Sequence, residues 1–508
     1  MSDGLLLLAA GDEVAVATRA LTAGEVIPLP TGEPLTVRSS VPRGHKVAVV
    51  ARSAGEPVRK YGATIGRATA AIGVGEHVHV HNLEITEADQ PHEFGTDRHT
   101  LTPPPGDRPT FLGYPRADGR VGTRNYIGIL TSVNCSASTA RMIVDQFRGQ
   151  VLDAYPNVDG VVALTHRSGC GLVTESEGAR VLMRTLRGYA AHPNIAGLLV
   201  LGLGCEMLQS SRIVDSADIP SSTLIEQLVI QDEGGIRRTV RAGVEAVNRM
   251  LEPINALQRE PCDVSKLVLG LNCGGSDGYS GITANPALGV ASDRLVSYGG
   301  TSILAETPEV HGAEGLLTRR AVSEAVGRKL LDRLDWWRDY TAAGGGTMDN
   351  NPSPGNKAGG LTTILEKSLG AVAKGGHADL AEVVEYAERP RVPGLIFMDT
   401  PGYDPVSVTG IVAGGANVVC FTTGRGSVFG CKPVPSIKLG TSTELYERMP
   451  EDIDINCGTI VDGTDTLEEV GDTVFEQILA VASGRQTVSE ELDLGQEEFV
   501  PWQLGAVT

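Results

Sequence analysis

The sequence predicts an α/β protein: a small all-β domain at the amino end, followed by two α/β domains with mainly parallel sheets. Roughly the first ninety residues alternate apolar and polar side chains in short segments separated by glycine turns, as at 13–17, 46–51 and 77–81, which is typical of a small β domain. From residue 114 onward, short runs of Ile, Val and Leu alternate with helix-like stretches at the spacing of βαβ units. A chain of 508 residues also exceeds the size of one hydrophobic core, so several domains are expected.

Changes in composition divide the chain into four segments. Residues 1–92 form the predicted β domain, and 93–112, which contains several prolines and one histidine, is interpreted as a linker. The two α/β domains are expected at 113–258 and 259–508. Helices are predicted at 138–150, 175–191, 236–257, 319–340 and 467–482, strands at 395–398 and 417–421, and a polar loop at 343–360.

The composition argues against several classes of protein. With a formal net charge of −19, the chain is expected to bind neither nucleic acid nor an anionic membrane. Eight cysteines without a CxxC pair argue against a disulfide framework and against structural zinc. No apolar run approaches the roughly 20 residues of a membrane span, and the run at 5–10 lacks the flanks of a secretory signal, so the expected location is the cytoplasm.

Four cysteines each follow a short run of Ile, Val and Leu that breaks into Gly, Ser or Asn. They are Cys135, Cys170, Cys205 and Cys273. Such runs are typical of buried parallel strands, and ligands of open α/β sheets gather beyond the carboxyl ends of these strands. Soft thiolates at these positions are candidate ligands of a transition metal or an iron centre. The alternative is that the thiols only pack in the core, since free cysteine is among the most buried residue types.

Three histidines, His77, His79 and His81, alternate along one predicted strand of the β domain. Side chains two positions apart on a strand point to the same face, so the three imidazoles are expected together, and imidazole is the commonest protein ligand of metals. A solvated histidine edge is the alternative. In the same domain, His45 and Lys46 offer a possible base beside a cation.

Glycine-rich turns are the candidate substrate-binding segments. The turns at 273–277 and 422–426 present successive backbone N–H groups to an anion, and an arginine in the second suits a bidentate carboxylate contact. Neither turn, nor the one at 354–357, matches a phosphate-loop or dinucleotide motif. The substrate-binding candidates are Ser276, Asp277, Asn356, Thr422, Thr423 and Arg425.

These segments and several others resemble the altronate/galactarate dehydratase family, over essentially the whole chain. The similar segments are RGHKVA at 43–48, KYG at 60–62, GEHVHVHN at 75–82, GYPRADGRVGTRN at 113–125, GLGCE at 202–206, CGGSDGYSGITANP at 273–286, NPSPGNK at 351–357 and TTGRG at 422–426. The resemblance implies an N-terminal SAF-type (β-clip) domain, loss of water from a small-molecule sugar acid, and a divalent metal, Fe²⁺ before Mn²⁺. We also expect a homo-oligomer.

The substrate and the type of metal centre have several candidates. Within the family, the histidine-rich strand at 77–81 and the segment 399–405 favour an altronate-type aldonate, with galactarate second. A sulfolactate-type sulfo-lyase is a third relative, in which the β domain is often a separate chain. An iron–sulfur lyase, in which three of the four thiols hold a cluster, is a further candidate. A sugar-acid-binding regulator is the non-enzymatic alternative, although no DNA-binding motif or basic patch is present.

The implied reaction specifies which groups a site must contain. Dehydrating an aldonate removes the proton on C2, beside the carboxylate, and expels the hydroxyl on C3, which requires a Lewis acid, a general base and a general acid. The catalytic candidates are His45, Lys46, His166, Glu206 and Lys357, without assigned roles. The metal-ligand candidates are the four cysteines and the three alternating histidines. We expect the histidines of the β domain to face the cysteine-rich strand ends, which would place the site between domains.

Overall fold

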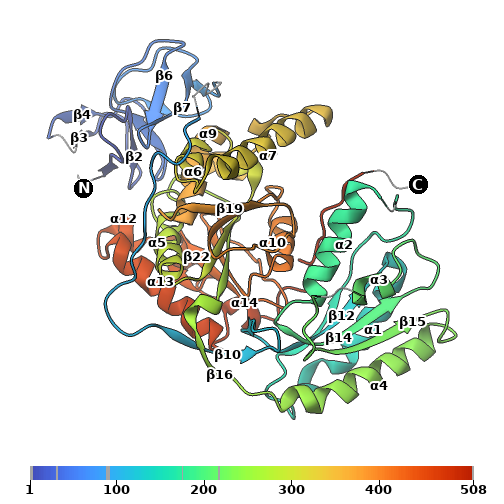
Figure 1. The fold of residues 1–508 in the computed structure, drawn as a ribbon. Coiled ribbons are helices and arrows are strands. Elements are labelled where there is room, and N and C mark those ends of the chain that lie inside the picture. Colours follow the sequence, from blue (N-terminus) through green and yellow to red (C-terminus); the bar gives the residue numbers. More distant parts are fainter. Residues whose placement is uncertain (1–3, 30–31, 87–91, 174, 216–217, 506–508) are drawn as a thin grey trace.

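Three regions with different architectures make up the computed structural model, which describes residues 4–29, 32–86, 92–173, 175–215 and 218–505 (Figure 1). The amino-terminal region is built of short antiparallel strands. The two regions that follow carry parallel sheets packed against helices. This architecture confirms the predicted fold class.

The small β domain contains a four-stranded sheet of order β1-β2-β5-β8, a three-stranded sheet of order β6-β7-β9 and the hairpin β3-β4. Its strands are β1 (Leu5–Leu6), β2 (Val14–Ala17), β3 (Val26–Pro28), β4 (Pro34–Thr36), β5 (Lys46–Ala48), β6 (Pro57–Lys60), β7 (Ala63–Ala68), β8 (His77–Val78) and β9 (Leu83–Glu84). Val47 of β5 lies opposite His77 of β8 in an antiparallel register. Because side chains alternate along both strands, this register brings His45 and His79 to the same face as His77.

The second region carries a four-stranded parallel sheet of order β13-β12-β14-β15. Helices α1 and α4 pack on one face and α2 packs on the other. Every residue of β12 and β14 is buried, which is why these strands are unbroken apolar runs in the sequence. The elements are β12 (Tyr126–Thr131), α1 (Ala137–Val144), β13 (Gly160–Leu164), α2 (Glu177–Ala190), β14 (Ile195–Gly202), α3 (Ser211–Val214), β15 (Leu224–Val229) and α4 (Ile236–Asn255).

The third region is built on a seven-stranded parallel sheet of order β19-β20-β18-β17-β21-β22-β23. Its strands are β17 (Val268–Cys273), β18 (Thr301–Leu304), β19 (Leu380–Val384), β20 (Gly394–Met398), β21 (Val418–Thr423), β22 (Ser436–Gly440) and β23 (Ile455–Asn456). Its helices are α5 (Ala284–Ser297), α6 (Gly315–Thr318), α7 (Glu324–Ala343), α8 (Pro354–Ala358), α9 (Ile364–Val372), α10 (Asp404–Ala413), α11 (Thr443–Arg448), α12 (Thr459–Asp462), α13 (Leu467–Ala482) and α14 (Val488–Glu491).

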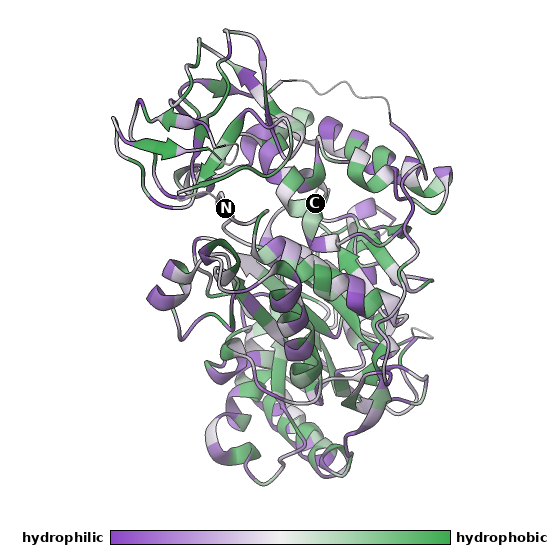
Figure 2. Ribbon diagram, turned by 90° about the vertical axis from the view of Figure 1, so that its left-hand side faces the viewer, coloured by the Kyte–Doolittle hydropathy of each residue, from purple (hydrophilic) through white to green (hydrophobic). Residues whose placement is uncertain are grey.

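Helices cover both faces of the large sheet. On one face, Leu269 and Leu271 of β17 pack into a core shared with α5 and α13. On the other face, Gly270 lies so close to α10 that a side chain there would meet Ile411 at 2.7 Å. Helix α10 in turn packs against α2 of the second region, so the two α/β regions share one apolar core. Figure 2 shows the hydrophobic strands inside and hydrophilic residues on the outer faces of the helices.

The three regions are joined at two places. A small antiparallel sheet of order β11-β10-β16 links the two α/β regions, with strands β10 (Thr110–Pro115), β11 (Val121–Gly122) and β16 (Glu260–Asp263). The small β domain packs instead through β7 against α9 of the third region, at the end of the molecule away from the second region (Figure 1). It is therefore the third region that can share a site with the β domain.

Most predicted helices and strands lie within two residues of where they were expected, and three larger differences remain. The helix predicted at 138–150 ends as an α-helix at Val144 and continues in 3-10 turns. The helix predicted at 319–340 begins at Glu324, because the Ser323 hydroxyl caps it by accepting a hydrogen bond from the Val326 amide. The polar loop predicted at 343–360 contains the short helix α8. Among the described residues, no helix combines the length and apolar character that crossing a membrane requires.

Candidate active site

The carboxyl ends of the seven parallel strands form one edge of the large sheet, and β17 and β21 are neighbours at its centre. They are the first and fifth strands of this sheet in chain order. The chain continues from β17 to β18 on one side of the pair and from β21 to β22 on the other side. Ligands of open α/β sheets bind at such a switch point. The turns after the two strands interlock there, because the amides of Gly424 and Arg425 donate to the Gly275 carbonyl at 2.8 and 3.1 Å.

Asp277, a predicted substrate-binding residue, is buried in the turn after β17. Its carboxylate accepts hydrogen bonds from the hydroxyls of Ser280 and Thr441, both at 3.0 Å. Burial raises the pKa of Asp277 although these hydrogen bonds oppose the change. The residue therefore holds the turn against the segment after β22, and its polar atoms are already engaged.

Three further predicted substrate-binding residues also shape the turns. Asn356 donates from α8 to the Ser276 carbonyl at 3.0 Å, which ties this helix to the sheet edge. The Thr422 hydroxyl donates to the Asn285 side chain at 2.7 Å. The Thr423 hydroxyl accepts the amide of Gly426 at 3.1 Å. These contacts give the residues a role in positioning the turns.

Arg425 differs from its neighbours because its side chain is exposed. Within the described residues, its guanidinium makes no hydrogen bond or ion pair, although its backbone amide does. It lines a cavity of about 270 Å³ together with Arg43, Gly44, Asp277 and Ala358. A free planar guanidinium at a polar cavity is suited to bind a carboxylate in a bidentate manner.

The histidines of the small β domain, His45, His77, His79 and His81, lie beside this cavity and are called here the histidine group. His45 Nε2 lies 3.2 Å from the Ala358 carbonyl, and His45 Nδ1 lies 3.0 Å from His77 Nε2. A carbonyl only accepts, so a neutral His45 donates through Nε2 and accepts from His77 through Nδ1. This assignment leaves the lone pair of His77 on Nδ1, whereas His45 Nδ1 offers its lone pair to a metal ion only in place of the hydrogen bond from His77.

Burial keeps the imidazoles of His45, His77 and His79 neutral. It lowers the pKa of His45, and burial followed by repulsion between protonated His45 and protonated His77 lowers the pKa of His77 to about 3. Burial and the nearby Lys46 lower the pKa of His79 to about 4. Neutral imidazoles keep a lone pair for a metal ion at neutral pH.

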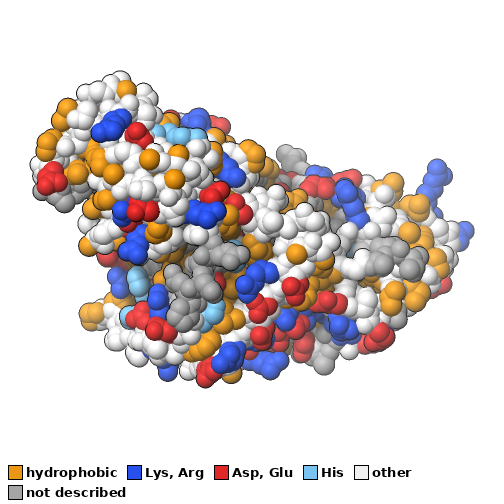
Figure 3. Space-filling view, turned by 90° about the horizontal axis from the view of Figure 1, so that it is seen from above, with side chains coloured by type: hydrophobic (Ala, Val, Ile, Leu, Met, Phe, Trp, Pro, Cys, Tyr) orange, Lys and Arg blue, Asp and Glu red, His pale blue; other side chains and the backbone are white. Residues whose placement is uncertain are grey.

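The geometry of the histidine group fits a metal ion. One nitrogen each from His45, His77 and His79 lies within 4.8 Å of the others, and His79 Nδ1 is buried without a hydrogen-bond partner in the part of the chain that the structure describes. The ring of His81 lies 5.4 Å from that of His77, at the exposed end of the group. Figure 3 shows histidine side chains reaching the surface on the small β domain. The group is a possible metal-binding site.

Lys46, a predicted catalytic residue, instead joins the β domain to the third region. Its amine donates to Glu366 at 2.8 Å and to the Gly360 carbonyl at 2.6 Å, while Lys60 donates to the other oxygen of Glu366 at 2.8 Å. All three charged side chains are fully buried. Burial lowers the pKa of Lys46 to about 8 against the opposing effect of Glu366. Burial alone would raise the pKa of Glu366, but the two lysines outweigh it and lower that pKa.

A second group of metal-type ligands lies at the end of β17 and is called here the thiol–carboxylate group. Cys273 Sγ lies 3.3 Å from an oxygen of Glu306 and 3.3 Å from an oxygen of Glu309. Lys374 donates to Cys273 Sγ at 2.8 Å and to Glu306 at 3.0 Å, and Lys367 donates to Glu309 at 2.6 Å. All five side chains are buried, so water does not screen their charges. The two lysines balance the charges of the two glutamates inside the protein.

Two features of the thiol–carboxylate group are unusual for a purely structural cluster. Glu306 has a left-handed backbone conformation, with φ of 70°, and its Oε1 atom is buried without a partner among the described residues. Strain of this kind occurs preferentially at functional sites. Nearby Asp404, at the start of α10, has a pKa raised to about 7 by burial and then by Glu306 and Glu309. A carboxyl group that titrates near neutral pH can act as an acid or a base.

We expect Asp404→Asn to stabilise the protein at pH 8 and to have little effect at pH 4. The folded carboxyl group keeps its proton up to about pH 7, whereas an unfolded one loses it near its ordinary pKa of 3.8. The folded state therefore binds more protons between these values, so stability falls as the pH rises from 4 to 7. Asparagine does not titrate, which removes a loss of at most about 4 kcal/mol.

Melting temperatures at pH 4, 6 and 8 measure this effect. Asp339→Asn, on the exposed side of α7, is the matched control and should show the pH dependence of the unchanged protein. If Asp404→Asn also follows that dependence, Asp404 does not carry the proton.

The remaining predicted residues lie at the edge of the four-stranded sheet, not at this site. Cys135, Cys170 and Cys205 follow β12, β13 and β14, whereas Cys273 follows β17 of the large sheet. Cys273 therefore lies at other strand ends than the three remaining thiols, because the strands belong to two sheets. The histidine group contacts the third region through His45, whose Nε2 lies 3.2 Å from the Ala358 carbonyl of α8.

His166 and Glu206, two predicted catalytic residues, hold loops at the edge of the four-stranded sheet. His166 Nε2 donates to the Thr131 carbonyl at 3.0 Å, and its Nδ1 accepts the Ser168 amide at 3.2 Å. Burial lowers the pKa of His166 to about 4. Burial alone would raise the pKa of Glu206, but hydrogen bonds from Ser132 and from backbone amides outweigh it and lower the pKa. Their polar atoms are engaged in local contacts.

Five charged or titratable residues of the candidate site were not among the sequence candidates. They are Glu306, Glu309, Lys367, Lys374 and Asp404. The two glutamates follow β18 and Asp404 follows β20, so the rule that ligands gather beyond strand ends applies to these three. The two lysines come from α9 and from the turn after it, and no spacing in the sequence relates them to Cys273.

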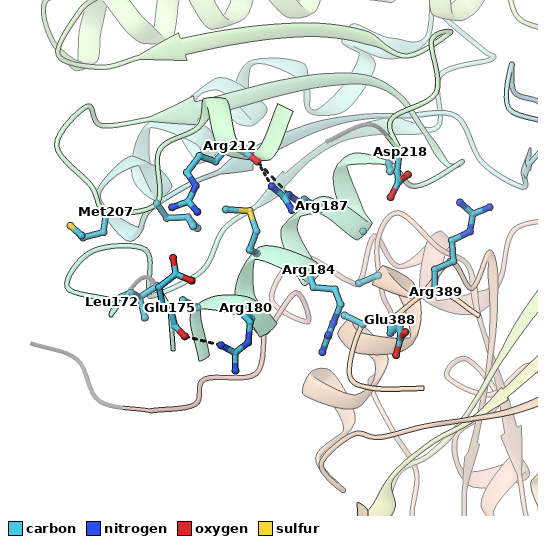
Figure 4. Close-up of a pocket in the computed structure, with 18 of the residues that line it drawn as sticks. Leu172, Glu175, Arg180, Arg184, Arg187, Met207, Arg212, Asp218, Glu388 and Arg389 are labelled. Atoms are coloured by element: carbon cyan, nitrogen blue, oxygen red, sulfur yellow. Dashed lines mark hydrogen bonds between the residues drawn. The ribbon is translucent and has the colours of Figure 1, made fainter. Parts of the chain in front are cut away.

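A separate cavity of about 510 Å³ lies between α2 of the second region and the segments 387–389 and 413–415 of the third. Its lining is rich in arginine, and Figure 4 shows Arg180, Arg184, Arg187, Arg212 and Arg389 around it. Arg187 is fixed by donating to the Arg212 carbonyl, and Arg180 by donating to the Glu175 carbonyl. In a chain with a net charge of −19, so many arginines around one cavity make it locally favourable for anions.

Comparison with known families places matches along the whole chain. Residues 4–86 match the altronate/galactarate dehydratase SAF domain. Residues 113–255 match the second domain of D-galactarate dehydratase/altronate hydrolase. Residues 264–507 match the C-terminal domain of D-galactarate/altronate dehydratase.

Three curated proteins are similar over nearly their full length. The galactarate dehydratase (L-threo-forming) of Escherichia coli K12 is 42% identical over 89% of this chain and 88% of its own. The altronate dehydratase of Bacillus subtilis 168 is 36% identical over 95% of both chains. The altronate dehydratase of Escherichia coli K12 is 37% identical over 95% of this chain and 96% of its own.

Proposed function

Because this chain belongs to the altronate/galactarate dehydratase family, and is thus a hydro-lyase that acts on sugar acids, we propose that its substrate is altronate, with galactarate as second candidate. The similarity to the altronate dehydratases extends over 95% of the chain and supports the first choice. The 42% identity to the galactarate dehydratase supports the second.

The observation that carries the proposal is the free guanidinium of Arg425 at a polar cavity beside three neutral imidazoles. We place the substrate carboxylate against Arg425 and a divalent metal, Fe²⁺ before Mn²⁺, on His45, His77 and His79. When bound, such an ion acts as a Lewis acid and stabilises the charge that develops on the carboxylate as the C2 proton leaves. The imidazole nitrogens and the unpartnered Nδ1 of His79 are suitable donors for either ion.

The chain's own residues then orient the substrate and move the proton. Lys357 is half-buried on α8, one residue from the carbonyl that His45 contacts, and we assign it the transfer of the C2 proton through Nζ. The Asn356 contact to the sheet edge holds α8 at the cavity. Lys46 and Glu366 act indirectly, because they hold the β domain and its histidines against the third region.

A turnover assay tests the proposed function. Protein prepared without oxygen is incubated with altronate, galactarate and other aldonates, with Fe²⁺, Mn²⁺ or no metal, and 2-keto-3-deoxy acids are detected. The proposal requires a keto acid from altronate only in the presence of metal. Turnover of galactarate alone would reverse the order of the two substrates, and no keto acid from any sugar acid would contradict the proposal.

We expect Arg425→Lys to raise KM for the sugar acid about 10- to 100-fold, with a smaller effect on kcat. Lysine keeps the positive charge but loses the planar fork, so one of two charge-assisted hydrogen bonds is lost. Arg448→Lys is the matched control, because Arg448 lines the same cavity from α11. Steady-state kinetics measure both variants, and an unchanged KM in Arg425→Lys would remove Arg425 from the carboxylate site.

A further inference from the structure

Three thiols follow neighbouring strands at the carboxyl edge of the four-stranded sheet, outside the site described above. Cys205 follows β14 by three residues, Cys135 follows β12 by four, and Cys170 follows β13 by six. Strand β12 is paired with β13 on one side and β14 on the other, in parallel. Neighbouring strands are about 4.8 Å apart, so three adjacent strands deliver one thiol each to a narrow stretch of this edge.

The three loops that carry the thiols, 132–136, 165–171 and 203–208, are held against one another. The Asn134 amide donates to the Ser168 carbonyl at 2.9 Å, and the Leu208 amide donates to the Gly169 carbonyl at 3.2 Å. Glu206 completes the connection, because it accepts the Ser132 hydroxyl at 2.7 Å and the Gly204 amide at 2.6 Å. The buried carboxylate of Glu206 and the buried imidazole of His166 thus order the loops next to the thiols.

Glycines allow the close approach of these loops. Gly169, directly before Cys170, has a φ of 100°, and a side chain there would meet the Ser132 carbonyl oxygen at 2.2 Å. Gly204, directly before Cys205, has a φ of 126°, and a side chain there would meet Gln231 at 2.4 Å. Both positions therefore require glycine, which fixes the direction in which the following thiol leaves the loop.

Exposure separates these three cysteines from the other five. Cys135, Cys170 and Cys205 are exposed, whereas the remaining cysteines are buried. Unligated cysteine is among the residue types most often buried. Three exposed thiols on neighbouring, interlocked loops are therefore not explained by packing.

We propose that Cys135, Cys170 and Cys205 together hold an iron–sulfur cluster through their thiolates. Thiolates are the common protein ligands of such clusters. The three thiols offer sulfur ligands, whereas the histidine group offers nitrogen ligands. The adjacent His166 adds no nitrogen ligand, because both of its ring nitrogens are engaged in hydrogen bonds. A cubane [4Fe–4S] cluster held by three protein thiolates keeps one iron without a thiolate ligand. This iron can bind water or another ligand.

Two cavities flank the proposed cluster site. Asn134, Thr165 and His166, from the loops of Cys135 and Cys170, line a cavity of about 690 Å³. Leu172 and Met207, each two residues beyond a proposed ligand, line the arginine-rich cavity (Figure 4). A small anionic molecule can therefore approach the cysteine loops from the surface of the second region.

The test uses the full-length protein and does not depend on its dehydratase activity. The chain is purified without oxygen, or reconstituted with Fe²⁺ and inorganic sulfide, and desalted. We expect a broad visible absorption band from the thiolate-bound cluster, and about four iron and four acid-labile sulfide per chain. Cys135→Ser, Cys170→Ser and Cys205→Ser should each lower the sulfide content by more than about half, and the Cys135→Ser/Cys205→Ser pair should abolish it.

Cys262→Ser is the matched control, because the buried Cys262 thiol donates to a backbone carbonyl and a hydroxyl can do the same. It should keep the full sulfide content. Iron without sulfide, or sulfide that survives in the paired variant, overturns the proposal. Because the readout is spectroscopic and analytical, a failed dehydratase assay and a missing cluster are distinguishable results.

Discussion

Replacing His77 by alanine is expected to remove metal from the small β domain and to lower kcat by at least about a hundredfold, since disturbing even an outer partner of a metal ligand costs 10- to 100-fold. His77 lies at the centre of the histidine group. Its ring centroid is 5.1 Å from that of His45 and 5.4 Å from those of His79 and His81. The change removes a proposed ligand and also the hydrogen bond that fixes the ring of His45.

Metal analysis after dialysis and steady-state kinetics at saturating metal measure this prediction. His377→Ala is the matched control, since His377 is exposed at the far side of α5 and pairs with Asp293. This control should leave both the metal content and kcat unchanged. If His77→Ala keeps its metal while Cys273→Ser loses it, the ion belongs to the thiol–carboxylate group, and the histidine group has another role.

The sequence was sufficient to predict those features that depend on local pattern. Buried parallel strands are recognisable because both faces are covered, so β14 is an uninterrupted apolar run. The period of two along 77–81 correctly brought histidines to one face, and the structure adds His45 through the register of β5 with β8. The glycine-rich turn at 422–426 was proposed to bind a carboxylate through its arginine, and in the structure the exposed side chain of Arg425 lines a cavity.

Two features could not be predicted in this way: the sheet to which each strand belongs, and the hydrogen-bond partners of the polar side chains. Cys205 and Cys273 follow similar apolar runs, but the strands belong to different sheets, and nothing local to either run encodes that. Glu206 has the residue type of a catalytic acid, yet its hydrogen bonds to Ser132 and Gly204 only became apparent once the loops were placed. Lys46 has the residue type of a catalytic amine, and its partner Glu366 lies 320 positions away.

The buried ion pairs between the β domain and the third region lead to the largest expected effect on stability. Glu366 accepts hydrogen bonds from Lys46 and Lys60, and also from the Thr362 hydroxyl at 2.7 Å. Glu366→Gln keeps the shape of the side chain but removes its charge, which leaves two buried amines without a counter-ion. Removing one partner of a buried pair costs about 3 to 5 kcal/mol, so the interface between the two parts should weaken by an amount of this order.

Hydrogen exchange and thermal unfolding test this prediction at a defined place. In Glu366→Gln, the amides of the small β domain and of α9 should exchange faster, while those of β12 and β14 should not change, because these strands lie in the second region, at the opposite end of the molecule from the small β domain (Figure 1). Glu324→Gln is the matched control. Glu324 pairs with Arg328 on the exposed surface of α7, where solvent screens the charges, so the melting temperature of this variant should stay unchanged.

Protection from hydrogen exchange that is lost uniformly over the whole chain would contradict a local role of Glu366. Protection that is retained everywhere would show that the buried charges do not hold the β domain in place, and that the histidine group is positioned by the apolar contacts of β7 with α9 instead.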